Sequence, residues 1–175
     1  MKIAQALGLI REVPNFPEPG IRFQDITPLL ANGEAFLSIT DALGAIDIQA
    51  TLVAGIEARG FILAAAIAQN RSIGFIPLRK KGKLPHTTYS QKYGLEYGID
   101  ELEIHQDAVT GNSHVFIIDD VLATGGTAIA AIDLVRRAGG TISDIGFLLE
   151  IEALGGRDRI HEVHPDITIT SLAKK

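Results

Sequence analysis

Short apolar runs alternate with segments of helical period along most of the chain. Mainly apolar stretches at residues 51–55, 73–78, 115–119, 142–151 and 167–172 have the continuous hydrophobicity of strands buried on both faces. Between them, residues 59–69 form an alanine-rich segment and residues 126–138 a second segment typical of buried helices. This alternation predicts an α/β fold in which a parallel sheet carries helices on both faces.

Two other parts of the chain have their own patterns. Residues 3–12 predict a short helix, the prolines at 14, 17 and 19 predict an irregular segment, and Asn32 is placed to cap a helix near 34–46. Residues 79–107 are polar, rich in Tyr, Gly and Lys, and lack a helical period. They predict a protruding hairpin with strands near 87–93 and 100–105, and its aromatic content favours a functional lid.

Composition narrows the class of protein. The length of 175 residues, with 46% hydrophobic residues, suits one domain with a sizeable core. The net charge of -5 argues against a general nucleic-acid or anionic-membrane surface. There is no cysteine, which excludes disulfides and thiolate chemistry. With no signal-peptide pattern and no bilayer-length apolar run, we expect a soluble cytoplasmic protein.

The strongest chemical signal lies at residues 115–127, where an apolar strand leads into a small-residue loop that opens a helix. Ligands of open α/β sheets bind beyond the carboxyl ends of the strands. Gly125 and Gly126 let the backbone wrap closely around an anion, and Thr124 and Thr127 add hydroxyl donors beside the helix N-terminus. The loop therefore predicts a site for the phosphate of a sugar phosphate.

Asp119 and Asp120 precede this loop and cannot bind the phosphate, because like charges repel. Vicinal hydroxyls of a ribose, or a metal ion, are their natural partners. The plainer alternative is that the acidic pair ends a strand and the glycines turn the chain. The ordered combination favours the binding site, and the chain contains neither of the common glycine-rich nucleotide motifs.

These residues resemble the phosphoribosyl pyrophosphate (PRPP) motif of the type I phosphoribosyltransferases. Other segments resemble the adenine phosphoribosyltransferases within that family, in the family's order and over most of the chain: residues 16–30, 57–61, 79–85, 95–98 and 101–104. The resemblance implies a single domain over residues 1–175. Its parts would be a small N-terminal hood at about 1–33 and a flexible hairpin at about 79–107.

The resemblance also implies an activity. The family joins adenine to PRPP, giving AMP and pyrophosphate in purine salvage. Mg²⁺ would be held mainly by PRPP and water, with no direct protein ligand, as suits an ion that keeps its hydration. Members are usually homodimers, and neither nucleic acid nor membrane is an implied partner.

Site residues follow by position from the resemblance. The 5-phosphate group would be bound by Ala123, Thr124, Gly125, Gly126 and Thr127. Pyrophosphate would be bound by Glu57, Ala58, Arg59, Arg79, Lys80 and Lys83. The resemblance also implies a cis peptide bond between Glu57 and Ala58. The implied catalytic residues are Asp119 and Asp120 toward ribose, Arg59 toward the leaving group, and Glu96 toward the proton of adenine.

Adenine recognition is implied at the N-terminus and after the motif strand. Phe23 and Val121 would stack on the purine faces, and main-chain groups of Arg22 and Gln24 would read its edge. The family more often has Arg at position 24 and Leu at position 121. A backbone contact is indifferent to the first change, and valine still offers an apolar face. Tyr97 of the hairpin would act in the lid.

The sequence also has to be weighed against other functions, within the family and beyond it. A hypoxanthine-guanine or xanthine phosphoribosyltransferase would need a donor to the purine 6-oxo group. A non-catalytic PRPP-binding regulator would need a DNA-binding segment. In a phospho-receiver domain the acidic pair belongs near the N-terminus. His161 and His164 are three residues apart, but Pro165 follows and a third ligand is lacking nearby, so all five histidines are interpreted as surface or structural.

Overall fold

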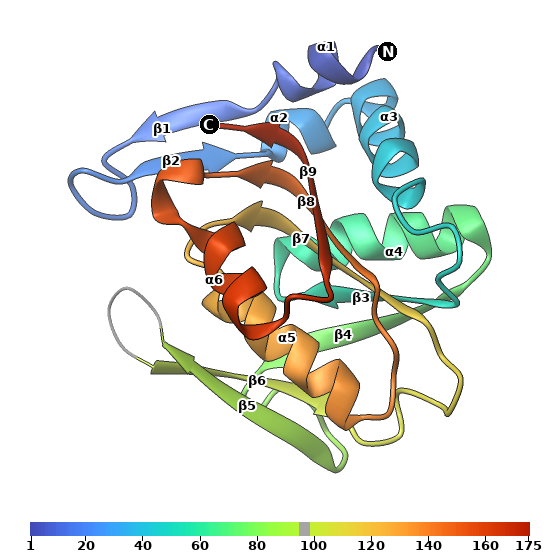
Figure 1. Cartoon of the computed structure of the whole chain (residues 1–175). Coiled ribbons are helices and arrows are strands. Elements are labelled where there is room, and N and C mark those ends of the chain that lie inside the picture. The colour runs from blue at the N-terminus through green and yellow to red at the C-terminus, as the bar shows by residue number, and fades with distance from the viewer. Residues whose placement is uncertain (95–98) are drawn as a thin grey trace. The chain divides into compact units, whose positions relative to one another are not determined.

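A seven-stranded sheet organises the larger part of the chain in the computed structural model, which describes residues 1–94 and 99–175 (Figure 1). The strand order is β5-β6-β4-β3-β7-β8-β9. The bounds are β3 (Leu52–Ile56), β4 (Gly74–Lys80), β5 (Thr88–Gly94), β6 (Ile99–His105), β7 (Val115–Leu122), β8 (Asp144–Glu150) and β9 (Thr168–Lys174). Strands β4, β3, β7, β8 and β9 pair in parallel, which confirms the predicted parallel sheet.

The predicted hairpin is confirmed as β5 and β6, which pair antiparallel with each other. It also extends the main sheet, because β6 pairs antiparallel with the end of β4 through Arg79↔Glu103 and Lys80↔Leu102. The sheet is therefore mixed at this edge. Local patterning finds a hairpin by its two strands and turn, whereas its attachment to a third strand depends on contacts distant in sequence.

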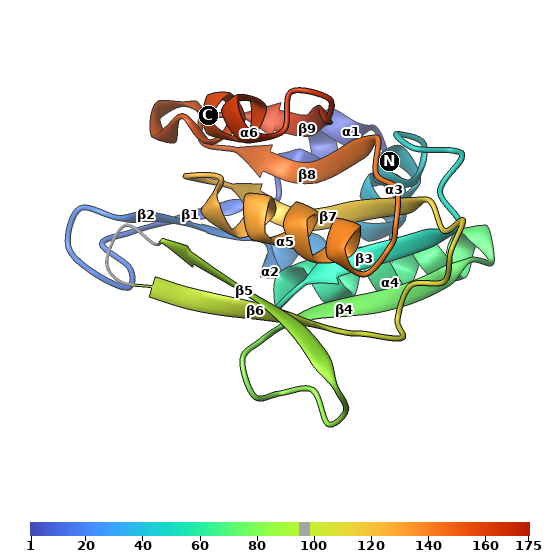
Figure 2. The ribbon, with the colours of Figure 1, turned by 60° about the horizontal axis from the view of Figure 1, so that its bottom comes forward.

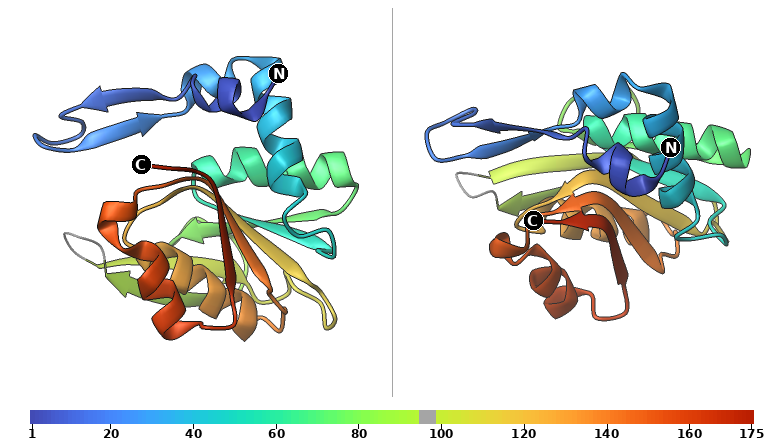
Figure 3. Two further views of the ribbon diagram at one scale, coloured as in Figure 1. Left: turned by 45° about the horizontal axis from the view of Figure 1, so that its top comes forward. Right: turned by 90° about the horizontal axis from the view of Figure 1, so that it is seen from above.

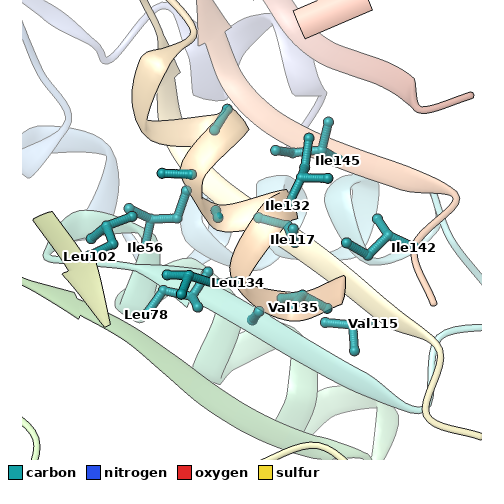
Figure 4. Packing of buried hydrophobic residues seen from close by; sticks show 14 of the residues in the cluster. Ile56, Leu78, Leu102, Val115, Ile117, Ile132, Leu134, Val135, Ile142 and Ile145 are labelled. Atoms are coloured by element: carbon teal, nitrogen blue, oxygen red, sulfur yellow. The ribbon is translucent and has the colours of Figure 1, made fainter. Parts of the chain in front are cut away.

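Helices cover both faces of the sheet, as predicted. The bounds are α4 (Arg59–Arg71), α5 (Gly126–Arg137), α6 (Gly156–Val163) and the short 3₁₀ helix η1 (Glu152–Leu154). Ile132 and Leu134 of α5 pack in one cluster with Ile56 and Ile117 (Figure 4). Gly55, the neighbour of Ile56 in β3, instead faces Ala64 of α4. Since successive side chains of a strand point to opposite faces, α4 and α5 lie on opposite sides of the sheet (Figure 3).

The start of α4 lies directly on the backbone of the sheet. A Cβ atom on Gly55 would stand 2.9 Å from the Gly60 carbonyl oxygen, and one on Gly60 would stand 2.7 Å from the Ile118 carbonyl oxygen. Only glycine allows so close an approach at these two positions. The contact holds the first residue of α4, Arg59, beside β7.

The chain divides into two compact units, Met1–Ala42 and Leu43–Lys175. The first contains α1 (Ile3–Leu7), β1 (Arg11–Pro14), β2 (Arg22–Asp25), α2 (Thr27–Leu30) and most of α3 (Gly33–Gly44). Asn32 accepts a hydrogen bond from the Ala35 amide at 3.0 Å, which confirms the predicted cap of α3.

The prediction of a helix over residues 3–12 is correct only to Leu7. Residues 11–14 instead pair antiparallel with residues 22–25. The proline-rich segment between them connects these two strands. Neither strand has the alternating apolar pattern that identifies a strand from sequence. No helix in the described residues is long and apolar enough to span a bilayer.

Candidate active site

The motif strand is longer than predicted, and this decides how its two aspartates lie. Strand β7 continues to Leu122, because its ladder with β8 runs on through Val121↔Leu149 and Leu122↔Glu150. Asp120 thus belongs to the strand, as Asp119 was predicted to, and does not follow it. Neighbouring residues of a strand face opposite sides of the sheet. The two carboxylates therefore meet different surroundings.

Asp119 lies beside the predicted phosphate loop. It lines a pocket of about 60 Å³ together with Val121 and residues of the loop. The Asp120 amide donates a hydrogen bond to its Oδ1 at 2.9 Å. Burial, together with the charge of Asp120, raises the pKa of Asp119 well above its ordinary value. A carboxylate in this position is suited to accept hydrogen bonds from a polar ligand that enters the pocket.

The loop itself has the form that the sequence predicts. Gly125 has a φ of +80°, in the left-handed region that glycine favours, and helix α5 begins at Gly126. Four of the five predicted phosphate-binding residues line the pocket: Ala123, Thr124, Gly125 and Thr127. Gly126 contributes the first turn of the helix. Phe147 of the adjacent strand β8 also lines the pocket, although no motif in the sequence marks it.

Asp120 contacts Arg59. The Arg59 Nε atom lies 2.8 Å from the Asp120 Oδ2 atom, and the Asp120 side chain is 6% exposed. Burial raises the pKa of Asp120, and the Arg59 charge opposes that rise. The ion pair joins the motif strand to the segment expected to bind pyrophosphate.

The remaining predicted pyrophosphate residues gather around Glu57, at the carboxyl ends of β3 and β4. The Lys83 Nζ atom contacts Glu57 Oε1, while the Lys80 amide and Arg79 Nε donate to Oε2 at 2.9 and 3.3 Å. Although burial works in the opposite direction, these hydrogen bonds hold the pKa of Glu57 below its ordinary value. The peptide between Glu57 and Ala58 is cis, as predicted.

A second group of contacts joins the hairpin to the phosphate loop. The Lys80 Nζ atom lies 2.8 Å from Asp100 Oδ2, and the Tyr93 hydroxyl donates to the same oxygen at 3.1 Å. That hydroxyl also bonds with Thr127, and burial raises the pKa of Tyr93 to about 12. Strand β5 runs beside α5 in Figure 2. Asp100 was missed by sequence reasoning, because only the pairing of the hairpin brings it to Lys80.

The residues predicted to bind adenine fall in both units. In β2, the rings of Phe23 and Phe16 meet edge to face, with centroids 5.1 Å apart. Gln24 is buried, and its Nε2 atom lies 3.4 Å from Glu12 Oε2. Arg22 contacts the same carboxylate group. Val121 lines the phosphate-loop pocket in the larger unit.

The two hairpin residues singled out for proton transfer and lid action, Glu96 and Tyr97, lie outside the described residues. Among residues 1–94 and 99–175, no group of three His, Asp or Glu side chains is placed to hold a metal ion. His164 is buried, and its ring nitrogens lie 3.2 Å from Asp133 and 3.0 Å from Arg136.

Comparison with known proteins gives one consistent family. The model of the phosphoribosyl transferase domain matches residues 23–169. An adenine phosphoribosyltransferase of Streptomyces clavuligerus is 53% identical over 156 residues, which cover 88% of each chain. The crystal structure of an adenine phosphoribosyltransferase from Thermoanaerobacter pseudethanolicus is 44% identical with a TM-score of 0.92, covering 99% of this chain and 100% of that one.

A more distant relative has been solved with a base analogue. The enzyme of Giardia lamblia, complexed with 9-deazaadenine, is 36% identical with a TM-score of 0.92, covering 100% of this chain and 98% of that one. Fold, motif and similarity agree over nearly the whole chain. The chain belongs to the phosphoribosyltransferases, in their adenine phosphoribosyltransferase family.

Proposed function

We propose that the chain transfers the 5-phosphoribosyl group of PRPP to adenine, giving AMP and pyrophosphate in purine salvage. One observation carries the assignment. The phosphate-loop pocket, the carboxylate of Asp119 and a group of Arg and Lys side chains gather at the carboxyl ends of β7, β3 and β4. Similarity to adenine phosphoribosyltransferases over 88% of the chain supports adenine as the base.

The loop and Asp119 would bind the ribose phosphate. Backbone amides at the start of α5 and the hydroxyls of Thr124 and Thr127 supply donors for the 5-phosphate dianion. Asp119 accepts hydrogen bonds from the ribose hydroxyls. Its negative charge also favours the positive charge that develops on the ribose ring as the bond to pyrophosphate weakens.

In the transfer step, the adenine N9 lone pair forms the new bond to C1 while the C1–O bond breaks, and pyrophosphate leaves with that electron pair. The transition state has oxocarbenium character. Arg59, Arg79, Lys80 and Lys83 would neutralise the charge of the leaving group together with the main chain at Ala58. Glu57 holds three of these residues in one place through its hydrogen bonds.

By their match to the family's motifs, Phe23 and Val121 would each offer an apolar face to adenine, and the main chain of Arg22 and Gln24 would read the edge of the base. Glu96 would accept the N9 proton, and Tyr97 would help to exclude water. These assignments come from positions that match the family's motifs.

Mg²⁺ bound to PRPP would offset the charge of the pyrophosphate oxygens. The residues present fit such an ion, because Asp119 lies in a polar pocket, where burial and then the charge of Asp120 raise its pKa. A cation bound there would offset both effects. PRPP and water would supply most of its ligands.

We also propose a homodimer located in the cytoplasm, with neither nucleic acid nor membrane as partner, and one folded domain with the hood at about 1–33. Ile62 of α4 and Phe75 of β4 are 42% and 36% exposed, and Phe75 meets Phe61 edge to face. An apolar surface of this kind is typical of an interface between subunits.

The test is a parallel assay of pyrophosphate release with PRPP and Mg²⁺. Adenine, hypoxanthine, guanine, xanthine, uracil and orotate are supplied separately. Release with adenine alone supports the proposal, and release with a 6-oxopurine instead supports the hypoxanthine-guanine or xanthine alternative. Binding of PRPP without release for any base would support the regulator.

A further inference from the structure

The phosphate loop, residues 123–127, packs against a second segment that begins with Gly155 and Gly156. This segment takes no part in the proposed reaction. Strands β7 and β8 end side by side, and the Ile151 amide donates to the Leu122 carbonyl at 2.9 Å. The chain then passes through η1 to Gly155, which has a φ of +65°, and enters α6 at Gly156. This brings the first residue of α6 against the loop that follows β7.

The approach of the two backbones is closer than any side chain would allow. A Cβ atom on Gly156 would stand only 2.2 Å from the Ala123 carbonyl oxygen and 2.9 Å from the Gly125 nitrogen. A Cβ atom on Gly125 would stand 2.6 Å from the Gly156 carbonyl oxygen. All three obstacles are backbone atoms, which cannot rotate away as a side chain does. A methyl group at position 156 must therefore displace the loop.

The α6 segment is fixed firmly enough to act as a support. Arg157 donates from Nε to Glu150 Oε1 at 2.9 Å and contacts Oε2 through Nη2, and its Nη1 atom donates to the Ile169 carbonyl at 2.7 Å. The Ser171 hydroxyl donates to Glu150 Oε2 at 2.9 Å. Glu150 is 4% exposed. These bonds anchor the start of α6 to β8 and β9.

A side chain of the same helix reaches the loop itself. The exposed Arg159 donates from Nη1 to the Thr124 carbonyl at 3.3 Å. The segment thus contacts the loop at three consecutive residues, Ala123, Thr124 and Gly125, each of which also lines the pocket. The contacts fix carbonyl groups of the loop. Each carbonyl shares a planar peptide unit with the amide of the next residue, so the same contacts set the direction of the loop amides.

We propose that Gly156 and Arg159 are positioning residues, which set the loop in the geometry that binds the 5-phosphate. The inference rests on the proposed function, because it needs residues 123–127 to be the phosphate site. A phosphate held by several amides is sensitive to displacements well below 1 Å. The segment that holds the loop then determines affinity for the phosphate without contacting it.

The test compares two ligands that divide PRPP between them. Ribose 5-phosphate carries the phosphate for the loop, and inorganic pyrophosphate carries the leaving group; binding of each is measured by calorimetry. Gly156→Ala should weaken the binding of ribose 5-phosphate by about tenfold or more and raise KM for PRPP. The affinity for pyrophosphate and KM for adenine should stay within about twofold of the wild-type values. A general loss of structure would weaken both ligands.

Gly155→Asn is the matched control. Asparagine tolerates a positive φ, and a Cβ atom at position 155 has nothing within 4 Å. Its binding of both ligands should equal that of the wild type. If Gly156→Ala does not melt cooperatively, Arg159→Met decides the proposal. It leaves the backbone of α6 unchanged, removes an exposed donor together with its positive charge, and should weaken the binding of ribose 5-phosphate by about threefold. Glu162→Gln, in the same helix, is its control.

Thr127→Val separates the two proposals. If it weakens ribose 5-phosphate while Gly156→Ala and Arg159→Met do not, the phosphate site stands and the positioning role is overturned. If it leaves ribose 5-phosphate binding unchanged, the phosphate site is elsewhere and both proposals are overturned. Selective weakening by all three variants supports both.

Discussion

Two adjacent aspartates of one strand occupy different environments. Asp119 lines the phosphate-loop pocket, whereas Asp120 is buried against Arg59. Their pKa values are raised chiefly by burial, and each lies near the other's charge. Two carboxylates beside one arginine make the empty site less stable, and a ligand that brings hydrogen-bond donors or positive charge stabilises it.

Asp119→Asn tests this at a single residue. The folded pKa of Asp119 lies above its unfolded value, so its stabilising contribution is present below the unfolded pKa and is lost as pH rises through the folded pKa. At neutral pH the asparagine variant should therefore be more stable, by about 1 kcal/mol or more, while kcat/KM falls by about 10-fold to 100-fold. Thermal melts from pH 4 to 8 measure the first effect.

Asparagine retains an oxygen for the Asp120 amide, so the comparison isolates the charge. The gain in Tm should shrink toward acid pH. A variant that is less stable than the wild type at neutral pH would contradict the argument.

Tyr93 joins three parts of the site through one hydroxyl. Its pKa of about 12 keeps it protonated throughout the working range, so it acts as a hydrogen-bonding group and not as a base. Tyr93→Phe removes the bonds to Asp100 and Thr127. We expect KM for PRPP to rise by about 2-fold to 10-fold, with the pH profile unchanged. An altered ionisation in the pH–rate profile would show that Tyr93 has a different role.

At the scale of elements, backbone contacts through glycine set where helices and strands meet. Gly60 brings α4 onto β7, and Gly126 brings α5 to β5, where a Cβ atom would stand 2.8 Å from the Gly94 carbonyl oxygen. Helix α6 meets the phosphate loop in the same way at Gly156. Each of these contacts brings the first turn of a helix close to the candidate active site.

Gly60→Ala should separate α4 from β7. The new methyl group would stand 2.7 Å from the Ile118 carbonyl oxygen, which is fixed in the strand, and 3.0 Å from the Asp119 side-chain carboxylate. We expect a loss of about 1 to 3 kcal/mol in the free energy of unfolding and a weaker pair between Arg59 and Asp120. Denaturant melts and pyrophosphate binding measure the two effects.

Gly111→Ala is a suitable control, because nothing lies within 4 Å of its Cβ position and its φ is not positive. Equal melts for the two variants would mean that α4 can shift without cost.

At the scale of the whole molecule, apolar side chains remain exposed on α4 and β4. Ile62 and Phe75 lie on elements that also carry Arg59 and Arg79, so pairing of two chains at this face would bring a partner close to each site. A net charge of -5 leaves association to such local apolar surface and not to bulk charge attraction.

Ile62→Asp should therefore convert the proposed dimer to a monomer. Burying an unpaired carboxylate at an interface costs more than the roughly 1.5 to 3 kcal/mol that burial of an isoleucine contributes. Light scattering coupled to size exclusion measures the mass. Ile48→Asp is the control, since Ile48 is 77% exposed and lies outside α4 and β4. Monomeric wild type, or a dimeric Ile62→Asp variant, would refute the proposed interface.

The succession of β3, α4, β4, the hairpin, β7, α5, β8 and β9 was predictable from sequence, as were the form of the loop at residues 123–127 and the cap at Asn32, because each depends on neighbours within a few residues. Strands β1 and β2 and helix α6 were not predicted. Periodicity of apolar side chains, glycine conformation and capping chemistry are local properties. The cis peptide at Glu57 followed from the resemblance of its segment to the family.

Features that depend on pairing between distant parts of the chain were decided only by the tertiary structure. The ladder between β7 and β8 carried the strand past both aspartates and turned them to opposite faces. The hairpin register brought Asp100 to Lys80, and the turn after β8 brought Gly156 to the phosphate loop. These contacts join residues 20 or more positions apart, so no local pattern specifies them; they follow only when strands pair and helices pack.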